Sequence, residues 1–158
     1  MLTHYHKPLC LSLISVDLPV ESVIETAATL YKKDRNRFHI LLTAPPVNFP
    51  YQEQNKTDSP NNPQQWWLEI TPEQVIMTLQ GNGRLSYRHF WQQGAYGRSR
   101  YWLPNEMSQN KEPIRLHNFT RHLMLKGDAY PEHLRVEYEL WAGEVQLGSY
   151  ILNLEIRH

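Results

Sequence analysis

Apolar and polar residues alternate most regularly near the C-terminal end of the sequence. Over residues 134–140 every second residue is apolar or aromatic, and the residues between them are charged. A period of two is typical of a strand with one face buried and the other in water. The alternation resumes after a turn at 142–144 and changes phase at Gly148-Ser149, as a β-bulge would cause. The pattern predicts a hairpin whose buried side chains are Val136, Tyr138, Leu140, Leu152, Leu154 and Ile156.

Short apolar segments separated by turn residues fill the chain from residue 66 to residue 126. They are rich in β-branched and aromatic residues, which favour strands. One segment, 72–80, also fits a helix that begins with a capping box at Thr71, so both structures stay open there and the strand is favoured. The other predicted strands cover residues 66–71, 84–91, 98–103 and 114–126.

The N-terminal part of the chain has a different pattern. From Val20 to Tyr31 apolar residues recur every three or four positions, which makes one apolar stripe on a helix. Pro19 suits the first helical turn, and the order of charges along the segment suits the helix dipole. We predict an amphipathic helix over residues 19–34, which follows one strand and precedes a buried strand at 38–43.

Residues 44–65 interrupt these patterns with prolines and polar residues, which disfavour both ladders and helical turns. The segment is a long surface loop or a domain linker. We favour the loop, because the chain before it is too short to fold alone. Residues 1–158 are therefore expected to form a single domain.

These elements together predict a β-rich α+β fold. The strands follow one another with short turns, which is typical of an antiparallel meander of about seven to nine strands. The meander is expected to pack against the N-terminal helix, either as a curled sheet or as a closed or half-closed barrel. A barrel would remove exposed sheet edges, which otherwise favour aggregation.

Composition and charge limit the classes of function. The 16 basic and 16 acidic residues give a net charge of zero, which disfavours a dedicated nucleic-acid binder. The chain has no apolar stretch long enough to span a membrane and no readable secretory signal. Its single cysteine, Cys10, excludes an internal disulfide and fits a reducing compartment. We therefore expect a cytoplasmic protein.

Motifs for catalysis are missing from the sequence. It contains no nucleophile elbow, phosphate-binding loop, zinc-protease motif or C-x-x-C pair. Glu137 and Glu139 lie on the polar face of one strand, whereas glycosidase chemistry needs two carboxylates that face each other across a cleft. We expect no catalytic residue, no metal site and no cofactor. An enzyme of an unfamiliar type stays an alternative.

The segment 81–105 contains arginines and aromatic residues but no acidic residue. Arginine beside flat aromatic rings suits anionic, planar or stacked ligands. Alternation places the members of each strand on one face, and a turn at 92–97 allows the two strands to pair. These residues are Arg84, Arg88 and Phe90 on the first strand and Arg98, Arg100 and Trp102 on the second. Alternatively, the arginines pair with acidic residues of neighbouring strands, namely Glu137, Glu139 and Glu155.

Trp141 is expected on the polar face of its strand. An exposed tryptophan there indicates an anchor for an interface, or a rim residue that the 44–65 loop covers.

The sequence thus favours a non-enzymatic intracellular binding or assembly module that presents an arginine-aromatic face to an anionic ligand or protein partner. An alternative is a small-molecule barrel, because a helix followed by a meander resembles the architecture of calycin-like barrels that carry pigments or lipids. A second alternative is a weak single-stranded RNA binder. The candidate binding residues are Arg84, Arg88, Phe90, Arg98, Arg100, Trp102 and Trp141.

Overall fold

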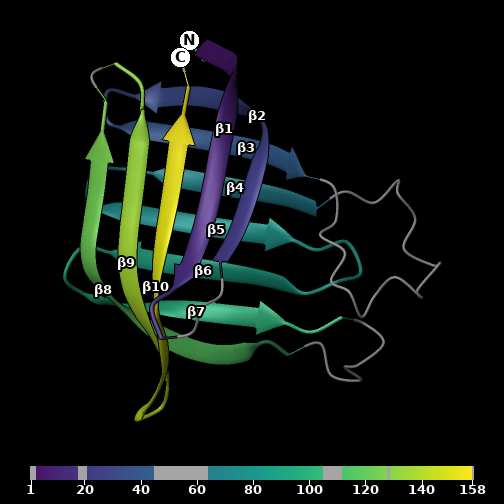
Figure 1. Ribbon diagram of the computed structural model, residues 1–158, viewed down its shortest axis with the longest axis vertical. Helices are drawn as coiled ribbons and strands as arrows, with labels where there is room; N and C mark the ends of the chain where they lie inside the picture. The colour runs from purple at the N-terminus through teal and green to yellow at the C-terminus, as the bar shows by residue number, and fades with distance from the viewer. Residues whose placement is uncertain (1–2, 18–20, 45–63, 105–111, 128, 158) are drawn as a thin grey trace.

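The computed structural model describes residues 3–17, 21–44, 64–104, 112–127 and 129–157. Within these residues the chain forms ten strands and no helix, and all strands pair antiparallel in one closed barrel (Figure 1). The strands are β1 (Thr3–Ser15), β2 (Glu21–Asp34), β3 (Arg37–Ala44), β4 (Gln64–Ile70), β5 (Gln74–Gln80), β6 (Ser86–Gln92), β7 (Tyr96–Trp102), β8 (Ile114–Lys126), β9 (His133–Ala142) and β10 (Val145–Ile156).

The order of strands around the barrel follows the sequence. Each strand pairs with the next one along the chain, and β1 closes the barrel by pairing with both β2 and β10. The prediction of a β-rich antiparallel fold is confirmed, and of the two predicted closures the barrel is the one observed. The ten strands exceed the seven to nine that we expected, because the segment predicted as a helix is a strand.

The helix predicted over residues 19–34 is wrong. Residues 21–34 form β2, in which Ala28 and Leu30 are buried whereas Val23 of the predicted helical stripe is 52% exposed. Residues 19 and 20 lie outside the described part of the chain. The short apolar residues of this segment fit a strand face as well as a helical stripe, so periodicity did not separate the two. Pairing with β1 along almost all of β2 decides for the strand.

Two long strands form the corners of the barrel. In Figure 1, β1, β9 and β10 cross the direction of β3–β7 at a steep angle, and β2 and β8 belong to both groups. β8 pairs with β7 through its first half and with β9 through its second half. A register shift between Thr120 and His122 marks the bend, as expected of a β-bulge at a sheet corner.

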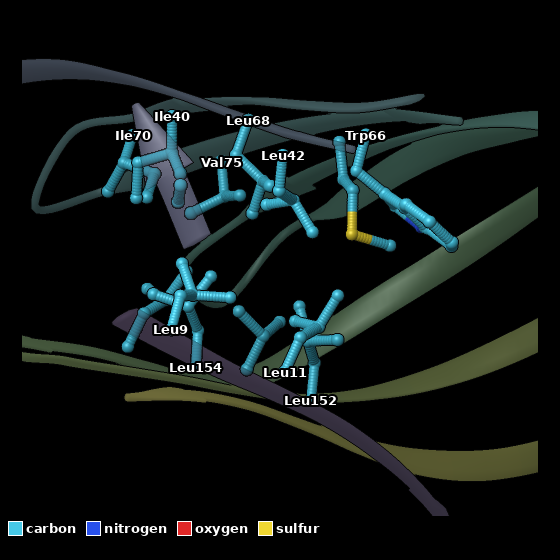
Figure 2. Close-up of a cluster of buried hydrophobic side chains, with 14 of the residues drawn as sticks. Leu9, Leu11, Ile40, Leu42, Trp66, Leu68, Ile70, Val75, Leu152 and Leu154 are labelled. Carbon is cyan, nitrogen blue, oxygen red and sulfur yellow. The ribbon is translucent and has the colours of Figure 1, made fainter. Parts of the chain in front are cut away.

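The hydrophobic core fills the inside of the barrel. The buried set predicted for the last hairpin is confirmed, and so is the bulge near Gly148. Figure 2 shows side chains from opposite walls that point toward one another. Those labelled on one wall are Ile40, Leu42, Trp66, Leu68, Ile70 and Val75 of β3–β5, and those on the other are Leu9, Leu11, Leu152 and Leu154 of β1 and β10.

Two further expectations concern segment 72–80 and the loop over 44–65. Residues 74–80 form β5, so the strand was the right alternative for the second half of segment 72–80. The loop expected over 44–65 lies outside the described residues except for its ends, which belong to β3 and β4. In the described part of the chain no helix is long and apolar enough to cross a membrane.

Candidate functional site

The β6–β7 hairpin carries an arginine-lined hollow on the outside of the barrel. In its register Arg88 lies opposite Arg100, and His89 lies opposite Ser99. His89 and Ser99 are buried inside the barrel, so alternation directs Arg88 and Arg100 outward. The hollow has a volume of about 410 Å³ and is lined by Ile76, Arg88, Phe90, Tyr96, Gly97, Arg98 and Arg100.

The floor of this hollow depends on a glycine. A Cβ on Gly97 would collide with the backbone carbonyl oxygen of Phe90. The Asn118 side chain of β8 reaches past Gly97, where its Nδ2 donates to that carbonyl at 3.1 Å and to Ser99 Oγ at 2.8 Å. The three strands β6, β7 and β8 are thereby tied together directly beneath the arginines.

Most of the predicted binding residues lie on this outer face. Arg88, Phe90, Arg98 and Arg100 line the same hollow, as alternation predicted. Trp102 follows Arg100 on the same side of β7 and is half-buried at the strand end, opposite Ser86.

Arg84 does not belong to this group. It is half-buried in the connection between β5 and β6, because β6 begins only at Ser86 and the alternation does not extend back to residue 84. Its backbone N–H donates to the carbonyl oxygen of Gly81 at 3.3 Å, within the turn. Three of the four arginines predicted to share a face therefore line the hollow, and Arg84 does not.

Trp141 lies on the outer side of β9, opposite His117, which in turn lies opposite Arg98. Its ring is stacked on His117, with centroids 6.5 Å apart and an interplanar angle of 7°. Its indole N–H donates to Glu139 Oε1 at 3.1 Å. Trp141 is therefore half-buried and held in place at the flank of the arginine face, two strands away from Arg98.

The sequence left open that Glu137, Glu139 and Glu155 neutralise these arginines. The described contacts show other partners for the first two glutamates. Glu137 pairs with Arg135 at 3.0 Å, and Glu139 pairs with Arg121 at 2.7 Å. Glu155 lies on β10, which does not pair with β6 or β7. No ion pair joins Arg88, Arg98 or Arg100 to a carboxylate within the described ranges.

A third arginine extends the pair across the sheet. Arg100 lies directly opposite Arg88 on one side and opposite Arg115 of β8 on the other. Like charges directly opposite each other in a sheet are destabilising. The fold thus places three arginines in one transverse row at a cost to its own stability, and a ligand of opposite charge would offset this repulsion.

Sequence reasoning missed several residues of this face. Tyr96 is 70% exposed and lines the hollow, and its place two residues before Arg98 could have indicated it. Ile76 could have been found in the same way from the alternation along β5. Arg115 carried no local signal, because its place opposite Arg100 depends on the register between β7 and β8.

A buried polar cluster lies behind the arginine face, inside the barrel. His89 is 2% exposed; its Nδ1 lies 2.7 Å from Ser99 Oγ and its Nε2 lies 3.2 Å from the Tyr101 hydroxyl. The Trp91 ring stacks on it, with centroids 4.8 Å apart. Burial lowers the pKa of His89 to about 3, so the ring is neutral near pH 7. His89 is therefore a buried histidine with a hydrogen-bonding neighbour at each ring nitrogen, and it supports the hairpin from behind.

Comparisons with known proteins report on the fold. Neither a family model nor a curated protein matches the chain. A solved structure, that of the YwiB protein from Bacillus subtilis, is similar, with a TM-score of 0.58 and 16% sequence identity. The alignment covers 97% of this chain and 94% of that one. At this identity the likeness shows a shared barrel architecture and transfers no residue role.

Proposed function

We propose that this protein is a non-enzymatic binding module that presents the outer face of β6 and β7 to an anionic partner. One observation carries the proposal: Arg88, Arg98 and Arg100 line one open hollow, and no described carboxylate pairs with them. Guanidinium groups bind carboxylates and phosphates through planar, two-pronged hydrogen bonds, and Phe90 and Tyr96 add flat apolar surface. Trp102 and Trp141 would flank the bound partner.

The absence of catalytic motifs from the sequence also supports a binding role. The calycin-like alternative, a carrier of pigments or lipids, stays a prediction, and so does a cytoplasmic location. The outer face is favoured over the interior as the binding site because its cations lie open to solvent.

Replacing Arg88 and Arg100 together by glutamate is expected to abolish binding of a polyanion. Heparin is a suitable probe, and its affinity can be measured by titration calorimetry at low salt, where such contacts are strongest. The fold should be kept, since surface substitutions usually change stability by about 0.5 kcal/mol or less. In the variant two glutamates lie opposite each other where two arginines lay, so the repulsion between residues 88 and 100 is of the same kind as in the parent.

A matched control reverses two positive charges at other positions. Lys7→Glu with Arg157→Glu changes the net charge equally but lies near the start of β1 and after the end of β10. We expect this double variant to bind heparin almost as the parent does. Equal losses in the two double variants, or no loss in Arg88→Glu with Arg100→Glu, would contradict the proposal.

A further inference from the structure

The arginine-lined hollow continues across the outside of the barrel. A second hollow, of about 370 Å³, shares Ile76 with it and reaches Glu69, His39 and Lys33. A third, of about 280 Å³, shares His39 and Lys33 with the second and ends against Trp67. The three hollows make one band over the outer faces of β2–β7, which we call the outer band.

The strand register places an exposed aromatic ring in line with the arginines. Reading straight across the sheet, Trp67 lies opposite Thr78, Thr78 opposite Arg88, and Arg88 opposite Arg100. Since neighbouring strands are about 4.8 Å apart, the backbone of Trp67 lies about 10 Å from that of Arg88. Trp67 is 50% exposed, and its ring meets His39 edge-on, with centroids 6.0 Å apart. One side of the row is therefore aromatic and the other is cationic.

Charge is segregated on this barrel even though the chain is neutral overall. Strands β5–β8 contain no Asp or Glu, whereas β9 and β10 contain three glutamates. The basic residues of β5–β8 are Arg88, Arg98, Arg100, Arg115, Arg121 and Lys126. The acidic residues of β9 and β10 are Glu137, Glu139 and Glu155. Local rather than net charge decides the potential that a partner meets, so the zero net charge does not argue against a polyanionic ligand on the outer face of β5–β8; Glu69 of β4 is the acidic residue that lines the second hollow.

We infer that the outer band, together with Arg115 of the adjoining strand β8, binds single-stranded nucleic acid, which crosses the strands along this row. The inference rests on the proposed function and names its partner. Arg88, Arg100 and Arg115 would contact successive phosphates, and a base would stack on Trp67. Arginine in a groove together with exposed aromatic rings is how single strands are bound without strong sequence preference. A run of carboxylates alone, as in poly-glutamate, would satisfy the arginines but would bring no flat ring to Trp67.

The test compares two polyanions and one aromatic substitution. Binding of a labelled oligouridine is followed by fluorescence anisotropy. The oligouridine has about 12 nucleotides, a length within the range that such surfaces cover. Trp67→Ala is expected to weaken oligouridine binding on the order of tenfold, because stacking of a base on the ring is lost. The same variant should bind heparin as the parent does, since heparin offers charge but no base.

Two control variants separate stacking from general damage. Trp67→Phe keeps a flat ring and should retain most of the affinity for oligouridine. Leu147→Ala removes an exposed apolar side chain from β10, far along the chain from the outer band, and should change nothing. Unchanged thermal midpoints establish that each variant is folded.

The arginines contribute the salt dependence of binding. Each phosphate contact with a single strand adds about −0.7 to the slope of log K against log salt, so three contacts give about −2. Arg88→Glu with Arg100→Glu is expected to remove most of this slope together with the affinity.

The outcomes distinguish this inference from the proposed function. If Trp67→Ala leaves oligouridine binding unchanged, the inference that the band binds nucleic acid is overturned. It is also overturned if poly-glutamate binds as tightly as oligouridine through the same arginines, and that result would indicate an acidic protein partner. If neither ligand nor heparin depends on Arg88 and Arg100, the proposed function itself fails. Arginine-dependent binding of oligouridine that also requires the ring of residue 67 supports both.

Discussion

Replacing Leu152 by alanine is expected to lower the free energy of unfolding by about 2–5 kcal/mol. Leu152 is 1% exposed and lies in the register between Leu13 of β1 and Val136 of β9, at the seam where the barrel closes. The substitution removes buried methyl groups and leaves a cavity in a core that cannot fully collapse around it. Chemical denaturation followed by far-ultraviolet circular dichroism measures the change.

The neighbouring residue is a matched control for this effect. Ile151 alternates with Leu152, faces the other side of β10, and is only partly buried. Ile151→Ala removes a side chain of the same size and should cost much less than Leu152→Ala. A larger cost for Ile151→Ala would mean that Ile151, and not Leu152, faces the core.

Acidification is expected to destabilise the protein through His89. Burial lowers the pKa of His89 to about 3, whereas an unfolded histidine has a pKa of about 6.5. Between these values the unfolded state binds a proton that the folded state does not, so stability falls as the pH falls. The loss amounts to at most about 1.4 kcal/mol per pH unit, and above about pH 6.5 this group adds no pH dependence.

Denaturation curves of the His89→Gln variant at several pH values between 4 and 7 test whether His89 causes this pH dependence of stability. The variant lacks the buried imidazole, so its free energy of unfolding should change less with pH than that of the parent. Tyr101→Phe provides the control, because it removes the hydroxyl near Nε2 but leaves His89 buried. Its pH dependence should resemble that of the parent. An equally steep loss of stability in His89→Gln would assign the effect to other groups.

The fold could be predicted from the sequence wherever one strand face is buried and the other is wet. Strands β9 and β10 show this alternation, and their buried residues were identified one by one. The segment that forms β2 carries a weaker pattern, because its inward residues include the small Ala28 and its outward residues include Val23. Pairing with its neighbours β1 and β3 makes this segment a strand, and such pairing is not visible in a local pattern.

The residues of the candidate face could likewise be predicted only where alternation within one hairpin defines their positions. Arg88, Phe90, Arg98 and Arg100 belong to one hairpin, whose short turn and alternation define a shared face. Arg84 was misplaced, because the alternation was extended back past the start of β6 into the preceding turn. Trp67 could not be linked to the arginines from the sequence, since the link depends on the register across β4, β5 and β6.

The location of the binding surface can be measured directly by nuclear magnetic resonance. Titration of heparin into the isotopically labelled protein, followed through the arginine side-chain Nε–H signals, reports which guanidinium groups meet the anion. We expect the signals of Arg88, Arg98 and Arg100 to shift together with one affinity, while those of Arg135 and Arg157 stay in place. Shifts confined to Arg135 and Arg157, or spread evenly over every arginine, would contradict a binding face on β6 and β7.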